Sequence, residues 1–299
     1  MAITRHDSLD ASNPPTSPQL ETQQDNGDEQ GDDKVNIAFA TSSLPISNLH
    51  DKDEWKRHFS FGEATTVGHG CSGLVFAIDE ERVIKMFTDD EEGRMDLERE
   101  RMVYDELQSD GNFSDRIVRF EEQWESGLIL ERLAGTLRQH LRKLPQSATP
   151  PSARQWARET CEGLAFLHQH GVLHSDFGCQ NILLGVNNHV KLCDFAGSKI
   201  GNHDAWISYE VRSQRPSELG KQPTEKSELF ALGSVIFEIW TCRPPYASEP
   251  HSVVLQKFSA GEFPTSCITD TVVRGIVAGC WAGSYGTATE VHDDLDINT

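Results

Sequence analysis

The stretch that decides the fold runs over residues 174–196 and reads HSDFGCQNILLGVNNHVKLCDFA. Two short apolar runs, ILL and VKLC, flank the turn-forming segment GVNN, and this pattern predicts a β-hairpin. A hairpin of this length brings its two ends together, so we expect Asn181 and Asp194 to lie close to each other and beside Asp176. Three polar side chains therefore converge at one end of the predicted hairpin.

These three residue types suit metal-assisted phosphoryl transfer. Asn181 and Asp194 offer the oxygen ligands that Mg²⁺ prefers, and Asp176 offers a carboxylate that can accept a proton from a hydroxyl group. An aspartate in a loop is ordinarily a turn or capping residue. The spacing His-x-Asp-x4-Asn before an apolar strand is much harder to obtain by chance. The stretch therefore predicts a magnesium-dependent site for phosphoryl transfer.

A glycine-rich motif, GHGCSGLV, begins about a hundred residues earlier and contains Gly68, Gly70 and Gly73. Glycines let the backbone approach phosphate groups without a clash from a Cβ atom. The motif is weak by itself, because glycine-rich hairpins are common. Its context reads strand-turn-strand, whereas the dinucleotide-binding fingerprint requires strand-turn-helix. The motif thus favours a phosphate-covering loop over a dinucleotide site.

A lysine and a glutamate complete the candidate phosphate site. Lys85 ends an apolar strand one hairpin after the glycines, where a cation can hold the α- and β-phosphates, although such a lysine is often only a surface residue. The next segment, about 90–108, is predicted to form a charged helix. On this helix Glu100 shares a face with Tyr104, whereas Glu98 lies on another face. Glu100 is therefore the predicted ion-pair partner of Lys85.

Strand patterns come first along the chain and helix patterns follow, which indicates a two-lobed α+β protein. The expected N-lobe, about 58–133, is a five-stranded antiparallel sheet with one helix, and the expected C-lobe, about 134–295, is mainly helical. Strands are predicted within 58–88 (three) and at 117–124 and 127–133, with helices at 90–108, 151–169, 225–241, 251–259, 270–281 and 287–295.

The order of these motifs resembles that of eukaryotic protein kinases of the serine/threonine type over about 58–295. The matching elements are the glycine-rich loop, Lys85, Glu100, the hinge LERL at 130–133, HSDFGCQN, DFA, and the run ALGSVIFEIWTCRPPY. The resemblance implies a bilobal kinase fold that holds ATP and Mg²⁺ in the cleft between the lobes.

The resemblance also assigns a role to each matching residue. Adenine would lie between Val75 and Val83 on one side and Leu183 on the other, with its edge at the backbones of Glu131 and Leu133. The phosphates would lie under Gly68, Gly70 and Gly73 and would be held by Lys85, which Glu100 orients. Asp194 and Asn181 would bind Mg²⁺, and Asp176 would accept the proton of the substrate hydroxyl. The aromatic side chains of Tyr104, Phe195 and His174 would stack as a spine.

Several positions depart from the family pattern. Ala196 replaces the glycine that usually ends the DFG-like triplet, which stiffens that turn. Ser175 replaces the arginine that usually receives a phosphate from the activation segment, so activity is not expected to depend on phosphorylation of that segment. Gly178 replaces a lysine that lies near the γ-phosphate. Glu228 replaces the aspartate that anchors the catalytic loop. No arginine in the expected later position is evident as a partner for Glu218.

Composition limits the partners of the chain. A net charge of −20, from 27 basic and 47 acidic residues, argues against binding to nucleic acid or to anionic lipid. Residues 1–52 are rich in Pro, Ser, Gln and Asp and are predicted to form a disordered acidic tail. The seven cysteines include no Cys-x-x-Cys pair, and no apolar run approaches the roughly 18 residues of a membrane helix. We therefore expect a soluble intracellular protein of the cytoplasm or nucleus.

Three functional hypotheses stay open. The first is an active kinase that phosphorylates a protein substrate on Ser or Thr, as a monomer or in transient complexes. The second is a pseudokinase that binds nucleotide or acts as a scaffold, which Gly178 and Glu228 favour and the retained nucleotide and metal residues oppose. The third is a small-molecule kinase of the aminoglycoside or choline type. Such enzymes share His-x-Asp-x4-Asn but usually lack the DFA-like triplet and the central Leu-Gly helix.

Overall fold

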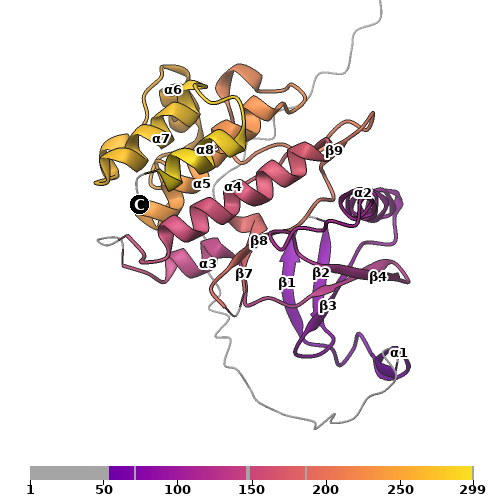
Figure 1. The fold of residues 1–299 in the computed structure, drawn as a ribbon. Coiled ribbons are helices and arrows are strands. Elements are labelled where there is room, and N and C mark those ends of the chain that lie inside the picture. Colours follow the sequence, from indigo (N-terminus) through magenta and orange to yellow (C-terminus); the bar gives the residue numbers. More distant parts are fainter. Residues whose placement is uncertain (1–53, 71, 146–148, 186, 298–299) are drawn as a thin grey trace, which may run out of the picture. The chain divides into compact units, whose positions relative to one another are not determined.

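The computed structural model describes residues 54–70, 72–145, 149–185 and 187–297. The predicted tail, residues 1–52, lies outside these ranges. The predicted two-lobed α+β architecture is confirmed: a sheet with one long helix is followed by a mainly helical lobe (Figure 1). Within the described ranges, no helix is long and apolar enough to cross a lipid bilayer.

The N-lobe contains a five-stranded antiparallel sheet with the strand order β1-β2-β3-β5-β4. Its strands are β1 (Thr66–Gly70), β2 (Gly73–Ala77), β3 (Arg82–Met86), β4 (Phe120–Trp124) and β5 (Gly127–Glu131). Gly73 begins β2 with a φ of +154°, and a Cβ atom there would collide with the carbonyl oxygen of Met86. Only glycine therefore allows the glycine-rich strand pair to approach β3 this closely.

Helix α2 (Glu91–Leu107) packs against this sheet. Asp90 caps its first turn by accepting a hydrogen bond of 2.8 Å from the amide of Gly93. As the periodicity predicts, Glu100 and Tyr104 share its buried face and have no exposed surface, whereas Glu98 is exposed. The helical repeat of 3.6 residues thus carries a charged side chain into the interior of the lobe.

A short helix, α1 (Glu54–His58), precedes the sheet and was not predicted from the sequence. The Trp55 ring meets Trp124 on β4 edge to face, with 5.0 Å between ring centroids. Five residues are too few to establish a helical period, so this helix depends on its aromatic contacts with the sheet.

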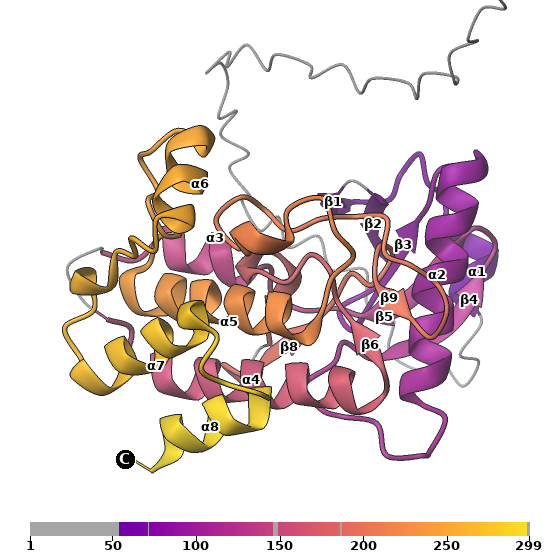
Figure 2. The same ribbon diagram turned by 90° about the horizontal axis from the view of Figure 1, so that it is seen from above.

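The C-lobe is built around helix α5 (Glu225–Thr241), which is buried from Ser227 to Trp240. Its apolar sequence on nearly every side predicted this central place. Helices α4 and α7 pack against α5, and α8 packs against α4 (Figure 2). The other helices are α3 (Leu137–Arg142), α4 (Ala153–Gln169), α6 (His251–Ser259), α7 (Thr271–Ala282) and α8 (Ala288–Asp296).

Short strands and 3-10 turns complete the structure C-terminal to the five-stranded sheet. The predicted hairpin forms between β7 (Ile182–Leu184) and β8 (Val190–Leu192), with Ile182 opposite Leu192. A second pair joins β6 (Val172–Leu173) to β9 (Lys199–Ile200). The 3-10 turns are η1 (Cys179–Asn181), η2 (Pro216–Glu218) and η3 (Thr265–Cys267).

Candidate active site

The β7–β8 hairpin places Asn181 at its start and Asp194 just after its end. The amide of Cys193 donates a 3.0 Å hydrogen bond to the carbonyl oxygen of Asn181, so the two ends are tied together. Asp194 adopts a positive φ of 68°, an uncommon conformation for a residue other than glycine. Strained backbone of this kind persists where the surrounding structure holds it, which is frequent at functional sites.

Asp176 lies beside this pair and is held by Asn181. The side-chain nitrogen of Asn181 donates to the Asp176 carbonyl oxygen and to its Oδ2, each at 2.8 Å. Because that nitrogen serves Asp176, the amide oxygen of Asn181 is the atom left for a metal ion. Burial raises the pKa of Asp176 to about 6, although His174 and the Asn181 hydrogen bond lower it. The carboxylate is therefore a better proton acceptor than an exposed aspartate.

Lys85 joins the two lobes. Its Nζ lies 2.6 Å from Glu100 Oε2 and 2.6 Å from Asp194 Oδ1. Burial by itself lowers the pKa of Lys85, but the charges of Asp194 and Glu100 outweigh burial and raise the pKa above its ordinary value. For Asp194, burial is outweighed by Lys85, so the pKa of this carboxyl is held below its usual range. Lys85 is thus a fixed cation at near-neutral pH.

Glu100 differs from Asp194 in its electrostatics. Its side chain is fully buried, and this burial raises the pKa of Glu100 despite the nearby charge of Lys85. A buried carboxylate of this kind needs its cation, because an unpaired charge in the interior is strongly destabilising. The ion pair therefore couples the position of α2 to the position of β3.

The glycine-rich strands lie directly over Asp194. Ser72 Oγ donates a 3.2 Å hydrogen bond to Asp194 Oδ1, and a Cβ atom added to Gly70 would lie 3.9 Å from Asp194 Oδ2. Gly68 faces Val75 across the β1–β2 pair. The backbone of this pair can therefore approach a group that is bound between it and Asp194.

The predicted adenine-contacting residues come from both lobes. Val75 lies opposite Lys85 and Val83 lies opposite Leu130 in the sheet. Leu133 and Leu183 are partly buried and pack against the core from the hinge and from β7. In the hinge, the amide of Glu131 donates to the carbonyl oxygen of Arg119 at 3.0 Å.

The three aromatic side chains that were expected to stack do so. Phe195 lies 5.4 Å from the Tyr104 ring and 5.4 Å from the His174 ring, measured between centroids. Phe120 on β4 extends the stack, at 5.2 Å from Tyr104. The sequence did not single out Phe120, because only the pairing of β4 with β5 brings it over α2. The stack links α2 to the loop that carries Asp176.

The donor set fits Mg²⁺ only together with phosphate oxygens. Asn181 and Asp194 provide two oxygen ligands, and magnesium commonly takes one or two protein ligands plus substrate phosphates. Within the part of the chain that the structure describes, no group of three or more His, Cys, Asp or Glu side chains forms a separate metal site. Six cysteines in that part are free thiols.

Glu228, the unusual residue of the central helix, anchors the catalytic loop. Its Oε1 accepts hydrogen bonds from the amide of Ser175 at 2.9 Å and from the hydroxyl of Tyr209 at 3.0 Å. Its Oε2 accepts one from the amide of His174 at 3.1 Å. The His168 imidazole lies 3.1 Å from the same oxygen. The glutamate side chain thus reaches from α5 and accepts hydrogen bonds from the backbone of the loop. Tyr209 and His168 bind the same carboxylate, and no sequence pattern indicated these two contacts.

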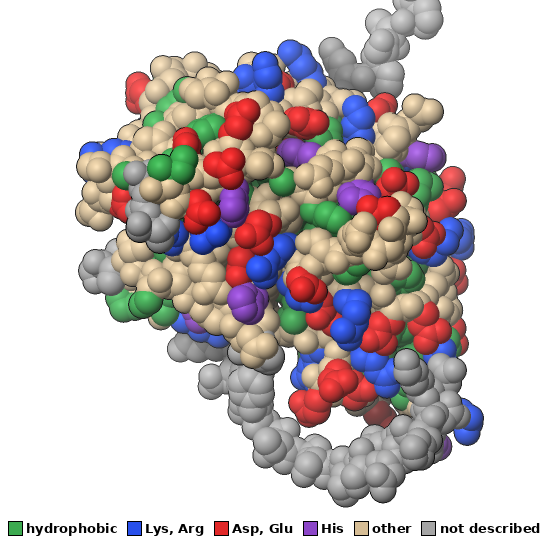
Figure 3. Space-filling view, in the orientation of Figure 1, with side chains coloured by type: hydrophobic (Ala, Val, Ile, Leu, Met, Phe, Trp, Pro, Cys, Tyr) green, Lys and Arg blue, Asp and Glu red, His purple; other side chains and the backbone are tan. Residues whose placement is uncertain are grey.

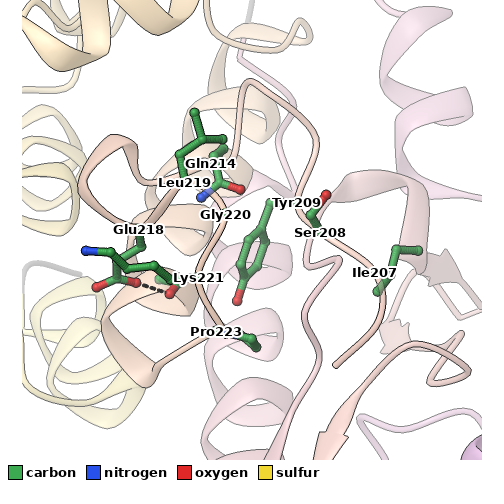
Figure 4. Close-up of a pocket in the computed structure, with 10 residues that line it drawn as sticks. Ile207, Ser208, Tyr209, Gln214, Glu218, Leu219, Gly220, Lys221 and Pro223 are labelled. Carbon is green, nitrogen blue, oxygen red and sulfur yellow. Dashed lines mark hydrogen bonds between the residues drawn. The ribbon is translucent and has the colours of Figure 1, made fainter. Parts of the chain in front are cut away.

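Glu218 finds its arginine within its own segment. Arg215 Nη1 lies 2.5 Å from Glu218 Oε1, and the hydroxyl of Thr224 donates to Oε2 at 3.0 Å. The partner that was missing later in the sequence is therefore supplied by Arg215, three residues before the glutamate. A pocket of about 310 Å³ opens beside this turn, between residues 207–209 and 218–223, with Tyr209 in its wall (Figure 4).

Comparisons with known proteins bear on the family and the fold of the chain. The family model of the protein kinase domain matches residues 61–269. The chain therefore belongs to the protein kinase domain family. The chain has the protein kinase fold, because the family match is accompanied by the five-stranded sheet and the mainly helical lobe of that fold.

Its curated relatives are larger kinases. The mitogen-activated protein kinase kinase kinase MCK1 of Pyricularia oryzae is 36% identical over 121 residues, which are 36% of this chain and 8% of the relative. The serine/threonine-protein kinase PknB of Mycobacterium tuberculosis is 26% identical over 184 residues, 56% of this chain and 29% of the relative. The mitogen-activated protein kinase kinase kinase dlk-1 of Caenorhabditis elegans is 33% identical over 99 residues, 31% of this chain and 11% of the relative. The chain thus matches less than a third of the length of each.

Proposed function

We propose that this chain is an active protein kinase that transfers the γ-phosphoryl group of Mg·ATP to a serine or threonine hydroxyl of a protein substrate. The observation that carries the proposal is the arrangement of Lys85 between Glu100 and Asp194, together with the two hydrogen bonds that the Asn181 side chain donates to Asp176. The relatives of the chain include serine/threonine-protein kinases, which supports a serine or threonine hydroxyl as the acceptor.

In this proposal each residue has one task. Lys85 binds the α- and β-phosphates and Glu100 orients it. Asp194 and Asn181 hold Mg²⁺, which supplies positive charge to the phosphates when it is bound. Asp176 accepts the proton of the attacking hydroxyl, a role that its raised pKa suits. The predicted adenine contacts complete the site: Val75, Val83, Leu183 and the backbones of Glu131 and Leu133.

A protein substrate is a better match than a nucleic acid. The chain carries a net charge of −20, which repels a phosphate backbone. On the face shown in Figure 3, Lys and Arg side chains lie among Asp and Glu side chains, without a continuous basic surface. The same charge favours substrates that are neutral or basic around the acceptor hydroxyl.

Of the two residues that favour a pseudokinase, Glu228 still accepts hydrogen bonds from the catalytic loop, so this alternative now rests on Gly178. No cation stands at this position to meet the γ-phosphate, and a Cβ atom there would collide with the amide of Gln180. Loss of one such contact lowers the rate of transfer but leaves the metal and proton-accepting groups in place. Nucleotide binding without any turnover is the result that this alternative predicts.

One experiment separates the two. Purified protein is incubated with labelled Mg·ATP and a generic protein substrate, beside an Asp176→Asn variant that nearly keeps the shape of the site. We expect transfer by the wild type and a loss of about a hundredfold or more in the variant, with ATP binding retained. Equal turnover of the two proteins contradicts the role of Asp176, and binding without turnover in the wild type identifies a pseudokinase.

A further inference from the structure

Helix α2 carries two charged side chains that face residues 198–206, the segment that includes β9. Asp96 and Arg99 lie three residues apart, so they project from the same side of the helix. Their exposed fractions are only 9% and 4%. Two opposite charges at this depth must be held by partners, because desolvation of an unpaired charge is unfavourable. Both find those partners in residues 198–206.

Arg99 binds the backbone of that segment. Its Nη1 donates to the carbonyl oxygens of Ser198 and, at 2.9 Å, of Asp204. The guanidinium carbon also lies 3.9 Å from the centre of the Trp206 ring, which is a cation–π contact. A single side chain of α2 therefore holds both ends of a seven-residue loop, and the figure shows this loop returning to α2 (Figure 2).

Trp206 closes the arrangement from the other side. Its indole N–H donates a 3.0 Å hydrogen bond to Asp96 Oδ1. The side chain remains 43% exposed, so burial alone does not fix the ring. Its orientation follows from two polar contacts with α2, one through Asp96 and one through Arg99. We call these three residues the tryptophan latch.

The latch affects catalysis because one of its residues, Arg99, lies next to Glu100 on helix α2. Arg99 immediately precedes Glu100, the partner of Lys85. Any rotation or outward shift of α2 that breaks the Glu100–Lys85 pair must also break the contacts of Arg99. Ser175, which replaces the usual arginine, donates its hydroxyl hydrogen to the carbonyl oxygen of Leu173 and supplies no charge to the segment.

We propose that the tryptophan latch holds α2 in its catalytic position and thereby makes the kinase active without a phosphate on residues 197–218. Asp96, Arg99 and Trp206 act as positioning residues, because they touch neither nucleotide nor substrate and act through Glu100. The inference rests on the proposed function for its effect on turnover. Its effect on the helix itself is independent of turnover.

The test uses phosphatase-treated full chain and four variants. Arg99→Met and Trp206→Ala remove the latch, and Trp206→Phe keeps a ring over Arg99 but removes the N–H that Asp96 accepts. Ile207→Ala is the matched control, since this neighbouring side chain is 37% exposed and lies against Gly197. For each protein, kcat and the KM for a peptide substrate are measured, together with amide hydrogen exchange of residues 91–107 and the Tm.

We expect Arg99→Met and Trp206→Ala to lower kcat about tenfold while the peptide KM changes less than about twofold, because the population with α2 in place falls. Trp206→Phe should lower kcat about threefold, and the kcat of Ile207→Ala should equal that of the wild type. Exchange should rise in α2 but not in α5, and the Tm should change little. A merely structural contact would lower the Tm and leave kcat unaltered.

Two results overturn the proposal. The first is that Arg99→Met and Trp206→Ala both have the kcat of the wild type and the same amide hydrogen exchange in α2 as the wild type. The other is a wild type that loses its activity on phosphatase treatment and regains it on rephosphorylation. If the wild type shows no turnover before or after treatment, the proposed function has failed, and the α2 exchange of the variants still decides whether the latch holds the helix.

Discussion

Replacing Glu228 by glutamine tests the buried anchor of the loop that carries Asp176. Oε1 accepts hydrogen bonds from the Ser175 amide and the Tyr209 hydroxyl, and Oε2 accepts one from the His174 amide. Glutamine offers one oxygen and one NH₂ group in place of two oxygens. Whichever way the amide turns, one backbone N–H of the loop then faces an amino group.

The magnitude follows from the hydrogen bonds that are lost. A buried N–H without an acceptor costs about 1–3 kcal/mol, and loss of the negative charge weakens the other bonds by about 1 kcal/mol. We therefore expect Glu228→Gln to lower the free energy of unfolding by about 2–4 kcal/mol, which corresponds to a fall in Tm of about 5–15 °C for a domain of this size.

Urea unfolding at pH 7 measures this loss, with Glu225→Gln as the control. Glu225 is exposed in the first turn of the same helix, so its replacement should cost less than about 1 kcal/mol. Glu228→Asp, which restores the residue usual in the family, keeps the charge but has a shorter side chain. Its loss of unfolding free energy should lie between the losses of Glu225→Gln and Glu228→Gln. A Glu228→Gln protein whose unfolding free energy lies within about 0.5 kcal/mol of the wild type would refute the reasoning.

The pH dependence has a definite sign. Burial opposes ionisation, but the hydrogen bond from His168 and the nearby charges of His168 and His174 hold the pKa of Glu228 below its ordinary 4.5. A carboxyl with a depressed folded-state pKa contributes stability above its unfolded pKa and loses it as the pH falls through the folded-state pKa. The difference in unfolding free energy between the wild type and Glu228→Gln should have its full value at pH 7 and should become smaller only at acidic pH, below 4.5.

Three further predictions concern the candidate site. Saturating Mg·ATP at about 100 times its Kd should stabilise the wild type by about 2.7 kcal/mol, and Lys85→Met should remove most of the accompanying rise in Tm in a thermal-shift assay; an equal rise in both proteins would contradict the role of Lys85. Because Asp176 must be ionised to accept a proton and its pKa is raised to about 6, kcat/KM should fall about tenfold per pH unit below that value and level off above it, and a profile that is flat from pH 5 to 8 would count against this assignment. Asp194→Asn should weaken the Mg²⁺ dependence of nucleotide binding in calorimetry, and unchanged Mg²⁺ affinity would exclude Asp194 as a ligand.

The sequence alone was sufficient for features that depend on short-range spacing. The run HSDFGCQN and the triplet DFA lie at the two ends of one hairpin, so their meeting follows from strand pairing between neighbours in the chain. Glu100 was separated from Glu98 by helical periodicity alone. The central helix, 225–241, was recognisable because apolar residues cover most of its circumference.

Only the tertiary structure decided which distant side chains meet. Glu228 gathers donors from residues 168, 174, 175 and 209, and the latch joins Asp96 and Arg99 to Trp206, about 110 residues later. No periodicity in the sequence predicts such contacts, because each depends on how helices and loops pack and on which buried polar groups need a partner. The sequence therefore determined the fold and predicted which residues form the candidate site, whereas packing decided what holds the loop of Asp176 and helix α2 in place.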